Sequence, residues 1–403
     1  MFKAQTSKTM LSPLPSIPPL AKVRHNDFII DCVHGTVDLD PLASFIVHTP
    51  DFQRLRLVKQ LDCDEIFTGA THTRFSHCIG TYHITRVWLN FLRQFAVPNI
   101  CTIDEWDTWQ TCIEIAALTH DLGHIAFSHL LDHILVESYG CIPHEERSVA
   151  LLKHLPDIDQ WLTTQQLNLI GHIILGQHTQ DACPPFVYQI VNNKFTDLDS
   201  DKIDYLLRDS LMTNKKVTFD WRDILFKSRI VEGEICFHES IHRSIYHLFF
   251  SRYNMFVEVY MSQPCLAYKL ARKHAILTYL KHYHQSFLPL VKNLDTVIQV
   301  TDEWMTSQLF RCPKTRPLIQ AIQDGTIPEV KHGNGTRESE VDITYRYTNQ
   351  TQHPILLVKF YRGQGLETFH LTQEDLSFQL PPISEVFSFY QASIEEVDAD
   401  VDS

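Results

Sequence analysis

Glycine-rich phosphate-binding loops are absent from this sequence. Its 403 residues include only 13 glycines, and no GxxxxGK[ST] segment occurs. The pairs Gly333/Gly335 and Gly363/Gly365 do not continue into GxGxxG. These absences exclude a P-loop nucleotidase and give no sign of a dinucleotide-binding loop. No segment repeats with a period of about 20 to 50 residues, which argues against a solenoid.

Long apolar runs and paired cysteines are also missing. No stretch approaches about 18 uncharged apolar residues, and the N-terminus lacks a signal-peptide core, so we expect a protein without a membrane anchor. The 10 cysteines are scattered without CxxC pairs. This scatter indicates neither a disulfide framework nor a zinc ribbon. We therefore expect reduced thiols in a cytoplasmic protein.

Positive charge is in deficit. The chain carries 35 Lys and Arg against 48 Asp and Glu, a formal net charge of -13. This balance argues against a protein that coats nucleic acid by neutralising phosphates, but it allows a local basic pocket. Nucleic acid is therefore a conceivable partner that the charge does not favour.

The apolar pattern divides the chain into four parts. Residues 1–24 are rich in Pro, Ser and Thr and predict a flexible leader. Residues 25–330 are mainly helical in pattern, whereas 331–390 contain β-forming segments such as VDITYRYT and PILLVKFYR. Residues 391–403 form an acidic tail. We expect a mainly α fold, with a helical core and a small C-terminal appendage of the α+β type.

Two of the expected helices are especially informative. Apolar residues recur at mostly three- and four-residue intervals from His72 to Phe91, as one buried helix face requires. The segment from Glu114 to Gly123 is apolar almost all round, which predicts a central helix. Further helices are expected at 161–176, 184–193, 200–212, 238–263 and 265–290.

The segment LTHDLGHIAFSHLLDH concentrates ionisable side chains beside the predicted central helix. His120, Asp121 and His124 are spaced so that two imidazoles and a carboxylate can converge from one helix end on a pocket for a metal and a phosphate. His129 and Asp132 follow in the same segment. A chain with 23 histidines contains about one His-Asp pair by composition alone, so the dipeptide by itself is weak. A single core histidine is also more often structural than a ligand.

Other polar residues in characteristic settings strengthen the metal hypothesis. His77 lies in HTRFSHCIG, His144 and Glu145 lie in PHEERS, and Asp201 lies in DLDSDKIDYLLRD. A metalloprotease is not indicated, because HEERS has Ser148 where HExxH requires a second histidine.

Seven ordered segments carry a resemblance to a known family. They are DCVHGTVDLDPL, TPDFQRLRLVKQL, GATHTRFSHCIG, ALTHDLGHIAFSH, HEERS, DSDKIDYLLRD and SRYNMFVEVY. In type, order and spacing they resemble the HD-domain deoxynucleoside triphosphate triphosphohydrolases, in particular the catalytic core of the SAM- and HD-domain enzyme and its bacterial relatives. The resemblance covers roughly residues 25 to 310.

The resemblance implies four metal ligands, His77, His120, Asp121 and Asp201. Two imidazoles and two carboxylates suit Fe, Mn, Zn, Ni or Co, and Asp121 can bridge to a second, oxygen-preferring ion such as Mg. Such ions polarise phosphoryl oxygens and lower the pKa of an attacking water.

The resemblance also implies the catalytic histidines. His129 together with Asp132 is expected to transfer a proton to the leaving group, and His124 and His144 are expected to contact phosphates. An imidazole held by a carboxylate is a suitable acid for a departing 5′ oxygen.

Substrate-binding positions follow from the same resemblance. Leu61 matters most, because a bulky apolar group against the sugar 2′ carbon disfavours a ribonucleotide, although core packing alone also explains a leucine. The implied contacts are Arg74, Lys202 and Arg252 for phosphates, Gln60 and Asp209 for the 3′ hydroxyl, Leu61 and Tyr205 for the sugar ring, and Tyr260 for the substrate site.

A regulatory nucleotide site is retained only in part. Gln53 and Arg56 match the family, and the family's dimers or tetramers place such sites at subunit contacts. Asp27 and His48 replace the basic and acidic residues that select guanine in the animal enzyme. We therefore expect an activating nucleotide and a homo-oligomer without assigning GTP.

Loss of basic residues near the phosphate end keeps other functions open. Val257 and Glu258 stand where the family has basic side chains, and Ser262 replaces a histidine. The first hypothesis is hydrolysis of a dNTP to deoxynucleoside and inorganic triphosphate. The second keeps the metal chemistry but acts on a monophosphate, a cyclic or signalling nucleotide, or a nucleic-acid end. The third is a non-enzymatic nucleotide sensor.

Overall fold

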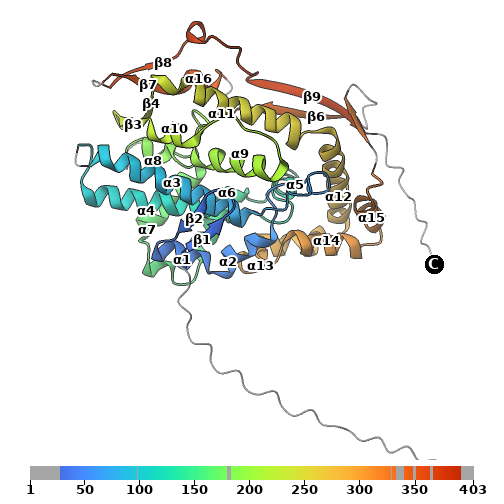
Figure 1. The fold of residues 1–403 in the computed structure, drawn as a ribbon. Coiled ribbons are helices and arrows are strands. Elements are labelled where there is room, and N and C mark those ends of the chain that lie inside the picture. The colour runs from blue at the N-terminus through green and yellow to red at the C-terminus, as the bar shows by residue number, and fades with distance from the viewer. Residues whose placement is uncertain are drawn as a thin grey trace, which may run out of the picture.

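Helices make up most of the described chain (Figure 1), as the sequence predicts for a mainly α fold. The computed structural model describes residues 28–391 except 98, 179–182, 328, 333–339, 348–350 and 364–365. The predicted leader (1–24) and all but the first residue of the predicted tail (391–403) lie outside the described residues. The helices are α1 (Pro41–Val47), α2 (Pro50–Gln53), α3 (Arg74–Ala96), α4 (Ile103–Thr119), α5 (His129–Tyr139), α6 (His144–His154), α7 (Thr164–Leu175), α8 (Phe186–Gln189), α9 (Ser200–Thr213), α10 (Trp221–Phe226), α11 (His242–Met255), α12 (Gln263–Lys292), α13 (Leu294–Val297), α14 (Asp302–Arg311), α15 (Arg316–Asp324) and α16 (Pro354–Leu357).

Helices α3, α4 and α9 form the centre of the molecule. Helix α3 packs against both others, and its Trp88 is fully buried. Helix α4 starts with a capping box in which Thr102 and Glu105 satisfy each other's backbone groups. Because α3 and α9 each carry candidate site residues, their packing brings distant parts of the sequence together.

The predicted helix from Glu114 to Gly123 is wrong at its C-terminal end. Helix α4 ends at Thr119, and the chain then forms a turn. The buried guanidinium of Arg54 donates hydrogen bonds to the carbonyls of Leu122 and His124, and the hydroxyl of Ser148 donates to the carbonyl of His120 at 2.6 Å. These side chains donate to backbone carbonyls that have no helical hydrogen bond. They therefore fix the turn that carries the HD residues.

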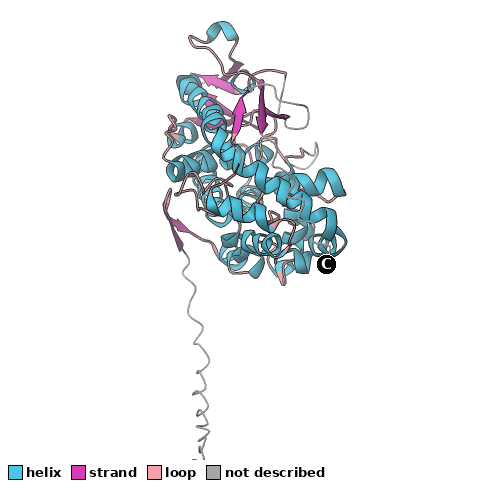
Figure 2. Ribbon diagram, turned by 90° about the vertical axis from the view of Figure 1, so that its right-hand side faces the viewer, coloured by secondary structure: helices cyan, strands magenta, loops and turns pink. Residues whose placement is uncertain are grey.

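Within the described residues, three small sheets accompany the helices, and Figure 2 shows strands beside the larger helical body. Strands β1 and β2 form a hairpin, the second sheet has the order β3-β4-β7-β8, and the third has the order β5-β9-β6. In Figure 1 the C-terminal strands, drawn in red, lie along one side of the helices beyond α11. The strands are β1 (Phe28–Asp31), β2 (Gly35–Asp38), β3 (Ser228–Val231), β4 (Glu234–His238), β5 (Val330–His332), β6 (Glu340–Arg346), β7 (Lys359–Arg362), β8 (Glu367–His370) and β9 (Ser384–Gln391).

The segment PILLVKFYR is only partly a strand. Pro354 opens the short helix α16, and the imidazole of His353 accepts a hydrogen bond from the amide of Ile355. Strand β7 follows and pairs in parallel with β4, while Phe360 is buried in the main core. The C-terminal region thus extends a sheet that begins in the helical part, and the division near residue 330 stays a prediction.

No helix within the described residues combines the length and the apolar character needed to cross a membrane.

Candidate active site

A cavity of about 430 Å³ opens beside the turn that follows α4. Its walls also come from α5, α6, α9, α12 and the segment before α3. The structure therefore brings together most of the residues that the sequence nominated. The predicted residues that line it are Gln60, Leu61, Arg74, His120, Asp121, His129, His144, Asp201, Tyr205, Asp209 and Tyr260.

One cluster, of which His120, Asp121 and Asp201 line this cavity and His77 lies buried behind it, has the character of a metal site. The Nε2 atom of His77 lies 3.2 Å from Nε2 of His120 and 2.9 Å from Oδ1 of Asp201. One potential ligand atom from each of the three residues lies within 4.8 Å of the others. The carboxylate of Asp121 completes the group, with one oxygen 3.6 Å from His120 and the other 3.7 Å from His77. The mixed nitrogen and oxygen set fits a divalent transition ion.

The electrostatics of this cluster favour a cation. Burial opposes charge on His77, yet the carboxylates of Asp201 and Asp204 raise its pKa to about 10. Burial also opposes ionisation of Asp201, but the two imidazoles hold the pKa of this carboxyl below its ordinary value. Because the carboxylates stay ionised, a divalent ion here meets matching negative charge.

Asp204 orients His77 and was missed in the sequence. Its Oδ2 atom lies 2.8 Å from Nδ1 of His77, and its Oδ1 lies 2.7 Å from Nε2 of His34. Arg208 donates to the same carboxylate at 2.9 and 3.0 Å and to Asp31 at 2.8 Å. A proton on Nδ1 of His77 leaves Nε2 free for a metal. The sequence did contain a signal for Asp204: it lies three residues after Asp201 and four before Arg208, so the three side chains share one face of a helix.

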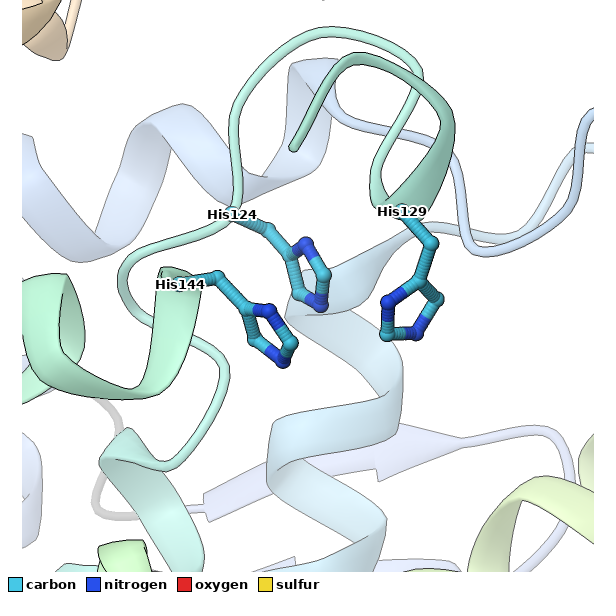
Figure 3. A group of neighbouring side chains, drawn as sticks. All are labelled: His124, His129 and His144. Atoms are coloured by element: carbon cyan, nitrogen blue, oxygen red, sulfur yellow. The ribbon is translucent and has the colours of Figure 1, made fainter. Parts of the chain in front are cut away.

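A second cluster consists of His124, His129 and His144, whose imidazoles face one another in Figure 3. The rings of His124 and His144 stack with centroids 3.9 Å apart, and His129 stands nearly perpendicular to both. Burial lowers the pKa of His124, and the charges of Arg74 and His144 lower it further. Desolvation in the pocket, then His124 and Arg74, lower the pKa of His129 in the same direction.

Asp132 contacts His144, whereas the sequence paired it with His129. Its Oδ2 atom lies 2.9 Å from Nδ1 of His144 and accepts the backbone amide of that residue at 3.2 Å. Its Oδ1 accepts from Arg147 at 3.2 Å. The predicted His129–Asp132 pair is therefore corrected: the side chain of Asp132 points from α5 to the start of α6, where both donors lie.

A strained turn places His129. Phe127 and Ser128 adopt positive φ values of 58° and 48°, which are costly for residues with a side chain. One oxygen of Asp302 accepts the amide of Phe127, and the other accepts the amide of Lys59, both at 2.8 Å. Burial raises the pKa of Asp302 to about 6. This carboxyl thus fixes the turn before His129 relative to the segment that leads into Gln60 and Leu61.

The cavity wall also contains a prearranged carboxylate, that of Asp209. Asp209 lies 2.7 Å from Nε2 of His72 and accepts a hydrogen bond of 2.7 Å from the hydroxyl of Tyr260. Arg74 also lines the cavity and donates to Asp121 at 2.6 Å and to Ser128 at 3.0 Å.

Two predicted phosphate ligands are engaged elsewhere. Lys202 pairs with Asp199 at 2.7 Å, and Arg252 lies 3.2 Å from Asp197, and neither cation lines the cavity. The cavity instead contains Lys269 from α12, which sequence reasoning missed. Only packing reveals this lysine, because no nearby motif marks it.

The predicted regulatory residues lie outside this cavity. The side-chain amide of Gln53 donates to the carbonyl of Val47 at 2.7 Å, and Nε of Arg56 donates to the side-chain oxygen of Gln53 at 3.0 Å. The guanidinium of Arg56 stacks 3.5 Å above the ring of Phe75. A regulatory role for the pair stays a prediction.

Comparisons with known proteins agree with the resemblance found in the sequence. Residues 74–188 match the HD domain family. A deoxynucleoside triphosphate triphosphohydrolase SAMHD1 homolog of Dictyostelium discoideum is 25% identical over 398 residues, 89% of this chain and 75% of the relative. Human deoxynucleoside triphosphate triphosphohydrolase SAMHD1 is 31% identical over 261 residues. The matched segment covers 58% of this chain and 41% of the human protein. A putative HD domain-containing protein of Acanthamoeba polyphaga mimivirus is 28% identical over 78% of this chain.

Proposed function

Since the chain carries an HD domain and is similar to SAMHD1 triphosphohydrolases over much of its length, we propose that it hydrolyses deoxynucleoside triphosphates to deoxynucleoside and inorganic triphosphate. One observation carries this proposal. One cavity is lined by His120, Asp121 and Asp201 of the mixed His/Asp cluster, by His129 and His144 of the histidine cluster, and by Leu61 and Asp209.

Four side chains of the first cluster would hold the ion. His77, His120, Asp121 and Asp201 supply two imidazoles and two carboxylates, a set suited to Fe, Mn, Zn, Ni or Co, with Mg on additional oxygen ligands. When bound, such ions polarise the phosphoryl group and promote ionisation of water.

His129 is the proposed proton donor to the departing 5′ oxygen. It lines the cavity, and the strained turn held by Asp302 fixes where its backbone enters α5. The surroundings lower the pKa of His129 in the substrate-free protein. A bound triphosphate brings several negative charges beside the ring, which favour the protonated form that a general acid needs.

The remaining contacts discriminate substrates. His72 and Tyr260 hold Asp209 so that its carboxylate can accept the 3′ hydroxyl, and Gln60 lies in the same wall. Leu61 offers a 2′ hydroxyl no hydrogen-bond partner, so a ribonucleotide loses the bonds it makes to water. Arg74, which also lines the cavity, is the proposed phosphate ligand.

Product analysis tests the proposal. Metal-loaded protein is incubated with each dNTP, and chromatography is expected to resolve deoxynucleoside and intact triphosphate in equal amounts. His129→Asn should lower kcat by about 10²- to 10⁴-fold, whereas His133→Asn, one turn further along α5 and exposed, should not. Release of nucleoside monophosphate and pyrophosphate would show that a different bond of the dNTP is cleaved and would contradict the proposed reaction. No turnover by the fully loaded protein would contradict the proposed activity.

Regulation forms a separate part of the proposal. Gln53 and Arg56 would bind an activating nucleotide, and the active form would be a homodimer or homotetramer. Sedimentation with and without added nucleotide checks both, because Arg56→Ala should abolish any assembly that the nucleotide induces.

A further inference from the structure

His124 is a buried imidazole without a hydrogen-bonded partner. Its exposed fraction is 0%, and neither ring nitrogen makes a hydrogen bond. Its Nε2 atom lies 3.3 Å from Oδ1 of Asp121, but not in hydrogen-bonding geometry. An unsatisfied buried polar group costs about 1–3 kcal/mol. A buried ring of this kind is therefore suited to a ligand that takes up its free nitrogen.

Two further imidazoles converge on the same space (Figure 3). One ring nitrogen from each of His124, His129 and His144 lies within 4.8 Å of the others. The three side chains come from the HD turn, the first residue of α5 and the first residue of α6. Asp132 engages Nδ1 of His144, which leaves Nε2 of that ring available. A carboxylate behind a histidine is the usual support of a metal-binding imidazole.

We propose that His124, His129 and His144 form a second metal site, selective for a nitrogen-preferring divalent ion such as Zn²⁺, and that its occupation inhibits the enzyme. It is separate from the His77, His120 and Asp201 cluster. An all-imidazole site favours Zn²⁺ over Mg²⁺ or Mn²⁺, which prefer oxygen.

The observed spacing is compatible with a zinc site. Zinc–nitrogen bonds of about 2.0–2.1 Å place tetrahedral ligands about 3.3 Å apart. The three ring nitrogens lie within 4.8 Å of one another, and rotation of the exposed His129 and the half-buried His144 can bring them to this spacing. The nearby positive charge of Arg74 is matched by Asp121 at 2.6 Å, and Oδ1 of Asp121 faces His124 as an anionic neighbour.

Inhibition follows from the shared histidine and rests on the proposed function. A nitrogen of His129 that binds an ion has no lone pair left to carry a proton, so it no longer serves as the acid. His144 likewise loses the nitrogen with which it would meet a phosphate.

Zinc stoichiometry tests the site independently of activity. Metal-free protein is dialysed against limiting and then excess Zn²⁺ in millimolar Mg²⁺, and bound zinc is measured by mass spectrometry. The wild type should bind one more equivalent than His124→Gln and than His144→Gln. His133→Gln, which removes an exposed histidine outside the cluster, is the matched control and should bind as the wild type does. Circular dichroism identifies any variant that does not fold. If one of the two cluster variants does not fold, the number of zinc equivalents bound by the other tests the site.

Turnover measured in the same titration separates the two proposals. Activity should rise with the first equivalent of zinc and fall at least tenfold with the second, and a chelator should restore it. Equal zinc binding by the wild type and both cluster variants would overturn the second site, as would a second equivalent that leaves activity unchanged or raises it. Two bound equivalents without any dNTP turnover would instead contradict the proposed function and leave the binding site standing.

Discussion

Replacing Asp204 with Asn should weaken metal binding without removing any of the four proposed ligands. The carboxylate of Asp204 is fully buried and lies 2.8 Å from Nδ1 of His77, so it keeps the proton on that nitrogen and makes Nε2 a stronger ligand. Loss of such a partner typically lowers metal affinity by about 10- to 100-fold, or about 1.4–2.7 kcal/mol. The free energy of unfolding should fall too, because Arg208 loses one of its two buried carboxylates. Removing one partner of a buried pair costs about 3–5 kcal/mol, and the remaining bond to Asp31 at 2.8 Å places the loss at the lower end.

Titration with Mn²⁺, followed by the electron paramagnetic resonance of the free ion, measures this affinity. Mn²⁺ is chosen because an all-imidazole cluster binds it poorly. The matched control is Asp31→Asn, which also removes a carboxylate from Arg208 but does not touch His77. It should lose stability and keep its Mn²⁺ affinity. The reasoning fails if Asp204→Asn binds Mn²⁺ as tightly as the wild type, or if Asp31→Asn weakens binding equally.

Three further changes test other parts of the structure. Burial raises the pKa of Glu114 to about 7; the folded state therefore holds a proton that the unfolded state releases near pH 4.5, and stability should fall as pH rises from about 4.5 to 7. Glu114→Gln should remove that loss. Denaturant unfolding should show a free energy of unfolding higher than that of the wild type by up to about 3 kcal/mol at pH 8 and nearly unchanged at pH 5. Equal effects at both pH values would refute the assignment. Leu61→Ala should raise the ratio of kcat/KM for ribonucleotide over deoxynucleotide by about tenfold, and an unchanged ratio would show that Leu61 does not face the sugar. Gly80→Ala places a Cβ 1.9 Å from Oδ1 of Asp204 and should lower Tm sharply. Gly171→Ala, also within a helix, meets only a methyl group of Val149, at 3.0 Å, and should lower Tm less. Similar Tm values for the two variants would argue against the close packing at Gly80.

Much of the site was predictable because its chemistry is local in sequence. The HD segment places His120, Asp121, His124 and His129 within ten residues of one another, so their proximity needs little knowledge of the fold. The helix that carries His77 could also be predicted from the sequence, because apolar residues at helical spacing determine which side of α3 is buried. Convergence of Asp201 on this group rested on the family resemblance, and the structure places it 2.9 Å from His77.

What only the tertiary structure decided is which partner each polar side chain meets. Spacing along α5 was compatible with Asp132 supporting His129, but Arg147 and His144 meet that carboxylate from α6. Lys202 and Arg252 carry the expected charge, yet buried aspartates engage both. Apolar periodicity is set by each helix alone and can be read from its residues, whereas the partner of a buried charge depends on which elements the fold packs beside it.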